Sequence, residues 1–152
     1  MLHNLRTQQI IKTDINTLWD FMSSPQNLAA ITPSYMGFHI LGNEPPQKMF
    51  AGQIIEYTVK PLAGIPMYWA TEITQVVEKE YFIDEQRFGP YTFWHHLHRF
   101  KKVSQGVEMT DTVHYKIPLG LIGRLAGGLF VHKQVQAIFD YREKKLNEIF
   151  NS

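Results

Sequence analysis

The feature that most constrains the fold is a series of strand-like segments between residues 37 and 117. In each segment apolar and polar residues alternate with a period of two, which is typical of β-strands with one buried face. Short clusters of turn-forming residues separate the segments, so we expect each strand to pair with its sequence neighbour as an antiparallel hairpin. The six predicted strands cover residues 37–41, 52–60, 66–77, 81–88, 91–103 and 107–117.

Other patterns stand before and after these strands. Residues 2–12 are expected to form a first strand, and Asp14 is suited to cap a helix that runs to about Met22. Pro25 suits the first turn of a second short helix, which Pro33 ends. The C-terminal segment places most of its apolar residues on one side of a long helix, and these residues are Val131, Val135, Ile138, Phe139, Leu146, Ile149 and Phe150.

These patterns together predict an α+β fold. A sheet with one apolar face needs a cover, and the long C-terminal helix is the element available to provide it. We expect a curved antiparallel sheet of about six or seven strands wrapped around this helix, with the two short helices between strands 1 and 2. A strongly curved sheet that grips one helix leaves a space between the two, and that space is a candidate binding cavity.

The composition limits the class of protein. A length of 152 residues fits one domain, which we expect to span residues 1–152. The net charge of +1 gives no reason to expect a nucleic-acid partner. The chain has no cysteine, which excludes disulfides, a thiolate nucleophile and Cys-ligated metals. Sequence motifs for nucleotide binding, dinucleotide binding and serine hydrolysis are also absent.

Two further observations concern membranes and location. The N-terminal segment MLHNLRTQQIIK lacks the apolar core of a signal peptide. The most apolar stretch, residues 117–131, contains Arg124 and four glycines and is too short to span a bilayer. We therefore expect a cytoplasmic protein that is a monomer or a weak dimer and has no stable membrane insertion.

The segment GPYTFWHHLHRF at residues 89–100 is the strongest pointer to a site. As a strand it sends Trp94, His96, His98 and Phe100 to one face. Two aromatic side chains beside two imidazoles suit the wall of a half-polar cavity better than a plain core or a plain surface. The sequence therefore predicts that this strand lines the cavity.

Three interpretations of the two histidines are open. Histidines two residues apart on a strand have Cα atoms about 6.6–6.8 Å apart, and they can chelate a metal if a carboxylate joins them. A hairpin turn at Ser104-Gln105 would place Asp111 opposite His98, and Asp84 stands on the preceding strand. His96 or His98, held by Asp111, could instead act as a general acid or base. The third interpretation, hydrogen-bonded cavity histidines, is favoured, so we predict no metal and no other cofactor.

Arg142 is unusual because the helical phase places it within the apolar stripe, between Ile138 and Leu146. A guanidinium group there must form an ion pair, reach out to water or meet a ligand. It could anchor a carboxylate or a phosphate, or it could form a buried ion pair with Asp111 or Asp84. The ion pair is the favoured interpretation, and both could hold if these groups form one network.

The segment PLGLIGRLAGG at residues 118–128 precedes the long helix. Its glycines loosen the backbone, and Leu121, Ile122 and Leu125 could form a mobile apolar lip. Such a lip would be a gate for an apolar ligand, or a contact patch for a membrane or a second subunit. Packing of the leucines onto the core is the alternative, and the sequence favours neither.

Several local patterns resemble one known family. They are NLAAITP at residues 27–33, FIDEQRFGPYTFWHHLHRF at 82–100, MTDTVHYKIPLG at 109–120 and IFDYREKKL at 138–146. With the order of the elements, they resemble the START-like helix-grip superfamily, and within it the SRPBCC branch related to polyketide cyclases and dehydrases. The resemblance covers essentially the whole chain and implies a deep cavity between the sheet and the C-terminal helix. Members bind lipids, sterols, polyketides or other apolar molecules, and some catalyse cyclisation or dehydration.

The leading hypothesis is a protein that binds a small, largely apolar molecule of lipid, polyketide or aromatic type, with an anionic or carbonyl group. A cyclase or dehydratase that uses His96, His98 and Asp111 is the enzymatic alternative. A module that contacts a membrane or a partner through residues 118–130 is the third. The predicted ligand-binding residues are Trp69, Asp84, Gln86, Trp94, His96, His98, Phe100, Asp111, Tyr115, Leu125, Phe139 and Arg142.

Overall fold

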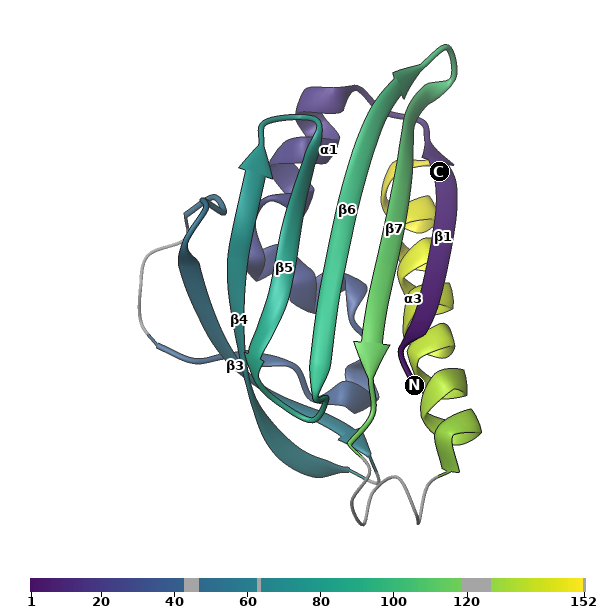
Figure 1. Ribbon diagram of the computed structural model, residues 1–152. Coiled ribbons are helices and arrows are strands. Elements are labelled where there is room, and N and C mark those ends of the chain that lie inside the picture. Colours follow the sequence, from purple (N-terminus) through teal and green to yellow (C-terminus); the bar gives the residue numbers. More distant parts are fainter. Residues whose placement is uncertain (43–46, 63, 119–126, 152) are drawn as a thin grey trace.

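The computed structural model of the chain shows a seven-stranded antiparallel sheet with a long helix against one of its faces (Figure 1). The structure describes residues 1–42, 47–62, 64–118 and 127–151. The strand order is β1-β7-β6-β5-β4-β3-β2, so strands β2 to β7 form a continuous meander and β1 pairs with β7. This arrangement confirms the predicted α+β helix-grip architecture and its sequential hairpins.

Each predicted strand is present, although several ends differ. The second strand is shorter than predicted because a 3₁₀ helix that was not predicted, η2 (Ser34–Met36), comes before it. Gly37 ends this helix in the left-handed conformation, with a φ angle of 51°. The strands are β1 (His3–Ile11), β2 (His39–Ile40), β3 (Gln53–Leu62), β4 (Ile65–Val77), β5 (Tyr81–Phe88), β6 (Phe93–Val103) and β7 (Gly106–Lys116).

The helices begin where the sequence predicts starts. Asp14 caps α1 (Ile15–Met22), and its Oδ1 accepts hydrogen bonds from the backbone N–H groups of Asn16 and Thr17 at 2.9 and 3.0 Å. The second short helix, η1 (Pro25–Ile31), is a 3₁₀ helix with its proline in the first turn, where no N–H donor is needed. The C-terminal helix, α3 (Gly127–Phe150), starts just before the predicted apolar stripe.

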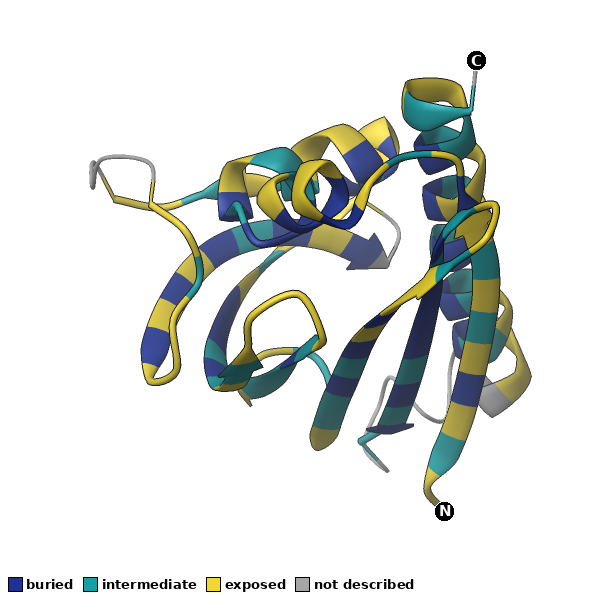
Figure 2. Cartoon of the chain, turned by 90° about the horizontal axis from the view of Figure 1, so that it is seen from above, coloured by how far each residue is buried: buried dark blue, intermediate teal, exposed yellow. Residues whose placement is uncertain are grey.

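The core lies between the inner face of the sheet and the helices. Near α1, Trp19 packs edge-on against Phe82 and Phe100, with ring centroids 6.1 and 5.6 Å apart. A second cluster lies under α3 and includes Val113 and Phe139, and a third belongs mainly to β3 and β4. The bands in Figure 2 show buried and exposed residues alternating along the strands. Members of all three clusters line one cavity.

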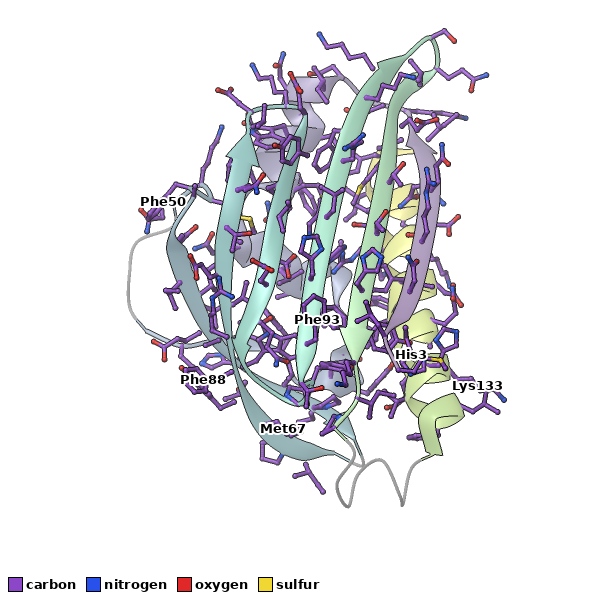
Figure 3. The ribbon with its side chains drawn as sticks, in the orientation of Figure 1. His3, Phe50, Met67, Phe88, Phe93 and Lys133 are labelled. Atoms are coloured by element: carbon purple, nitrogen blue, oxygen red, sulfur yellow. The ribbon has the colours of Figure 1, made fainter. Side chains whose placement is uncertain are left out.

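The outer surface carries several exposed apolar residues. Figure 3 shows Phe88 and Phe93 at the neighbouring ends of β5 and β6. Leu129 and Phe130, at the start of α3, are 70% and 50% exposed. The residues predicted to form an apolar lip, 121, 122 and 125, lie outside the described residues. Within the described ranges, no helix is long and apolar enough to cross a membrane.

Candidate functional site

A cavity lies between strands β3 to β6, the short helices η1 and η2, and α3. The cavity has a volume of about 130 Å³, which is far more than one water needs. Its wall is mostly apolar and rich in rings. The aromatic residues of this wall are Phe21, Phe38, Tyr57, Trp69, Phe82, Tyr91, Trp94 and Phe139.

Two histidines and two carboxylates form a cluster at this cavity. Strand β6 turns His96 and His98 inward, where they are 3% and 4% exposed. The register confirms the predicted pairing of His98 with Asp111 on β7, and it places Asp84 on β5 opposite His96. Asp84 and both histidines line the cavity, whereas Asp111 does not.

Each imidazole lies between the two carboxylates. His96 places Nε2 2.8 Å from Asp111 Oδ1 and Nδ1 3.3 Å from Asp84 Oδ2. His98 is turned the other way, with Nε2 2.6 Å from Asp84 Oδ2 and Nδ1 3.0 Å from Asp111 Oδ1. The last contact lacks hydrogen-bond geometry, so Nδ1 of His98 is buried without a hydrogen-bond partner. The two imidazole rings lie 3.6 Å apart between centroids.

The cluster favours ionised carboxylates. Burial raises the pKa of Asp84 and of Asp111, but the contacts with His96 and His98 lower it more, and each pKa lies well below the usual 3.8. Burial lowers the pKa of His96, but the two carboxylates outweigh that effect and raise this pKa above its usual 6.5. Asp84 and Asp111 are therefore negatively charged at neutral pH.

Arg142 reaches the same cluster from α3. It is 7% exposed and lines the cavity. Its Nη1 lies 3.8 Å from Asp111 Oδ1, which is an ion pair but too long for a hydrogen bond. Its Cζ lies 4.9 Å from the centre of the Phe139 ring, within cation–π distance. Nε and Nη1 are buried without hydrogen-bond partners, so the predicted ion pair is present but leaves the guanidinium group unsatisfied.

The wall formed by β3 and β4 is apolar in character although it contains polar atoms. Tyr57 and Trp69 are cross-strand partners whose rings stack with centroids 5.7 Å apart. Thr71 Oγ1 accepts a hydrogen bond from Trp69 Nε1 at 3.0 Å and lies 3.1 Å from the Tyr57 hydroxyl oxygen. Burial raises the pKa of Tyr57, so this hydroxyl stays protonated. The polar atoms of this wall thus satisfy one another, and the rings offer apolar surface.

One residue that was predicted beside the cluster, Tyr115, is placed differently. Tyr115 is buried on the inner face, but its hydroxyl lies 2.6 Å from His132 Nδ1 on α3 and does not line the cavity. His132 was not predicted, because the strand pattern gives no information on which helix residue lies above Tyr115. Leu125 lies outside the described residues.

Gln86 and Phe100 also have other roles. Gln86 closes the turn before β6, since its Nε2 donates a hydrogen bond to the Tyr91 carbonyl oxygen at 2.6 Å. Phe100 belongs to the core cluster of Trp19. The turn brings Tyr91 into the cavity wall, a placement that was not predicted. The predicted residues that the structure does bring together around the cavity are Trp69, Asp84, Trp94, His96, His98, Phe139 and Arg142.

Comparisons with known proteins agree with this architecture. No family model matches the sequence, and no curated protein matches it. A solved structure of a START superfamily protein from Mycobacterium smegmatis has a TM-score of 0.73 at 13% identity, over 98% of this chain and 97% of that chain. A protein from Chromobacterium violaceum gives 0.71 at 12% identity, over 98% and 97%. The major latex-like protein 151 from Panax ginseng gives 0.63 at 14%, over 95% and 97%. The chain therefore has the START-like helix-grip fold.

Proposed function

We propose that this protein binds a small, largely apolar molecule that carries one anionic group. The observation that supports this most directly is Arg142, a buried guanidinium group in the wall of an apolar cavity, with Nε and Nη1 free of hydrogen-bond partners. An unsatisfied buried cation destabilises a protein, and a bound anion would remove that cost. A bound anion would therefore account for a guanidinium group at this buried position, which the long contact with Asp111 alone does not.

The rest of the cavity suits the apolar part of such a ligand. Aliphatic and aromatic side chains such as Ile55, Tyr57 and Trp69 line it. Burial contributes about 25 cal/mol per Å² of apolar surface, so each 100 Å² or so of ligand surface contributes roughly 2.5 kcal/mol. Lipids, polyketides and aromatic acids share this combination of an apolar body and one charged group.

The anionic group would lie where Arg142 meets the histidines. Hydrogen bonds from a guanidinium group to a carboxylate are charge-assisted and are among the stronger polar contacts in proteins. Asp84 and Asp111 carry two negative charges, Arg142 carries one positive charge, and the raised pKa of His96 favours a proton on that ring. These positive contributions reduce the net negative charge of the cluster, so an incoming carboxylate meets a hydrogen-bond donor with less repulsion.

Binding is favoured over catalysis because the histidines are occupied. Every ring nitrogen of His96 and His98 lies within 3.3 Å of a carboxylate oxygen. A general base needs a nitrogen that can reach the substrate proton, and these nitrogens already face the protein's own carboxylates. The cyclase or dehydratase interpretation stays a prediction, as does the contact module at residues 118–130.

Native mass spectrometry of the purified protein tests the proposal. We expect a co-purifying apolar acid, or binding of added octanoate if none co-purifies, at one molecule per chain. Ile55→Trp should abolish this binding because it fills the cavity from its wall. Ile54→Trp is the control, since Ile54 is 54% exposed on the opposite face of β3 and the same ring there leaves the cavity open. Equal ligand loads in a folded Ile55→Trp variant and in the wild type would refute the proposal.

A further inference from the structure

We propose that Asp84, His96 and His98 bind one divalent transition-metal ion at the polar end of the cavity, and that Asp111 orients both imidazoles for it. This inference does not require the apolar ligand proposed above, although the metal ligands line the same cavity. The sequence alone favours hydrogen-bonded histidines without a metal. The arrangement of the four side chains gives three reasons to go further.

The first reason is that the ligand atoms converge. One ligand atom each from Asp84, His96 and His98 can be chosen so that all three lie within 4.8 Å of one another. Asp84 Oδ2 is 3.3 Å from His96 Nδ1 and 2.6 Å from His98 Nε2. A tetrahedral ion with bonds of about 2.1 Å separates its ligand atoms by about 3.4 Å. The first contact is already close to that length, and a small rotation of the Asp84 side chain would lengthen the second.

The second reason is the position of Asp111. Metal-bound histidines almost always direct their other ring N–H group to a carboxylate, a carbonyl group or water. Here Asp111 Oδ1 lies within hydrogen-bond distance of both rings, 2.8 Å from His96 Nε2 and 3.0 Å from His98 Nδ1, although only the first contact has hydrogen-bond geometry. Asp111 is 4% exposed and does not line the cavity. It would keep the N–H groups on its own side and the nitrogen lone pairs toward Asp84.

The third reason is the number of protons that the cluster needs without a metal. Four ring nitrogens face carboxylate oxygens, and a nitrogen lone pair that faces a carboxylate is repelled by it. Four protons would create two buried imidazolium ions whose rings lie 3.6 Å apart. With three protons, one nitrogen faces a carboxylate through its lone pair, as the unpartnered Nδ1 of His98 would. A metal ion beside Asp84 would give the nitrogen lone pairs on that side a favourable partner while both rings stay neutral.

The donor atoms indicate the class of metal. Two imidazoles and one carboxylate suit Zn²⁺, Co²⁺ or Fe²⁺ better than Mg²⁺ or Ca²⁺, which prefer oxygen ligands. Three protein ligands leave at least one coordination position open. Because Asp84, His96 and His98 all line the cavity, that position would face the cavity. Water or an oxygen atom of a bound molecule would occupy it.

A titration of metal-free protein with Co²⁺ alone tests the site, because the visible absorption of Co²⁺ depends on its coordination. We expect one Co²⁺ per chain, with the intense absorption of a four- or five-coordinate ion, and displacement of this ion by Zn²⁺. Asp84→Asn and His98→Gln should each weaken binding by at least about 10- to 100-fold, the loss seen when even an orienting group is removed. A spectrum that stays that of hydrated Co²⁺ would overturn the proposal.

A second pair of histidines provides the control. His95 and His114 are cross-strand partners on the outer face, with ring centroids 6.2 Å apart, and could hold a surface metal. The double variant His95→Gln/His114→Gln should bind Co²⁺ as the wild type does. If this variant loses binding and Asp84→Asn retains it, the proposal is wrong.

A crystal structure of the wild type with Co²⁺ makes the test independent of any variant's folding. The anomalous scattering peak should lie about 2.0–2.2 Å from ligand atoms of Asp84, His96 and His98. A peak found only elsewhere, or no peak, would overturn the proposal. Circular dichroism of each variant establishes that a loss of binding does not come from unfolding.

Discussion

His95 and His96 are neighbours in the sequence, yet they belong to two chemically different faces of the sheet. His96 is 3% exposed and lies between two carboxylates. His95 turns to the outer face, where it is partly exposed and its ring lies 6.2 Å from that of His114. The alternation of one strand thus separates a buried charged cluster from a surface pair. The groups around an imidazole, more than the imidazole itself, determine its chemistry.

The largest expected effect comes from breaking the inner cluster. Asp111→Ala removes the carboxylate that His96 and Arg142 share inside the protein. Removal of one partner from a buried charge pair costs about 3–5 kcal/mol, and we expect a loss of this size in the free energy of unfolding. His114→Ala on the outer face should cost less than about 1 kcal/mol. Urea denaturation measures both, and equal losses would contradict the difference between the faces.

Aromatic neighbours on β6 sharpen the same comparison. Trp94 packs against Trp69 and Tyr91 in the cavity wall, whereas Phe93 is 42% exposed. Trp94→Ala should lower the free energy of unfolding by about 2 kcal/mol, less than for a fully buried ring because Trp94 is only partly buried. Phe93→Ala should cost about 0.5 kcal/mol or less. Thermal unfolding of the two variants checks this, and a larger loss for Phe93→Ala would reverse the assignment of faces.

The pH dependence of stability should distinguish the two adjacent histidines. The lowered pKa values of Asp84 and Asp111 stabilise the fold above pH 3.8, and this contribution is lost as the pH falls further. The raised pKa of His96 contributes stability that is fully present below pH 6.5 and is lost as the pH rises through the raised value. For metal-free protein, the urea midpoint should therefore be highest between about pH 4 and 6.5.

Two variants test which histidine causes the loss of stability at high pH. His96→Gln should flatten the decline at high pH, because the group that loses its proton there is gone. His95→Gln should leave the decline unchanged. If the decline persists in His96→Gln and disappears in His95→Gln, the pH dependence comes from the outer face and not from the buried cluster.

The sequence predicts those parts of the fold that depend on one strand and its nearest turn. The short turn at Ser104-Gln105 leaves little freedom of register, so the pairing of His98 with Asp111 could be predicted from spacing alone. The helix η2 could not be predicted, because residues 34–36 are too few for a periodic pattern. Gly37 redirects the chain there, which leaves only two residues for β2.

The site is less predictable where it depends on packing between distant segments. The alternation of β7 correctly turns Tyr115 inward, but the position of α3 decides that its partner is His132. The place of Arg142 within an apolar stripe is visible in the sequence. Its lack of hydrogen bonds is not visible in the sequence. This lack depends on the distance between Arg142 and Asp111, which no local pattern encodes.

The smallest expected effect on stability belongs to Arg142→Met. This change removes an unsatisfied buried cation, which should stabilise the fold, but it also removes the charge that lies 3.8 Å from Asp111, which should destabilise it. Because the two effects oppose each other, the free energy of unfolding should change little. Arg99→Met is the matched control, because Arg99 is exposed on the outer face of β6. A strongly destabilised Arg142→Met variant would show that the guanidinium group supports the fold through Asp111.

The central claim, that the inner face holds an anchor for an anionic apolar ligand, is tested most directly by calorimetry with octanoate and octanol. The wild type and Arg99→Met should bind octanoate about 10- to 100-fold more tightly than octanol, the effect of hydrogen bonds to a charged group. Arg142→Met should lose this preference and still bind octanol. An unchanged preference for octanoate in Arg142→Met would contradict the account.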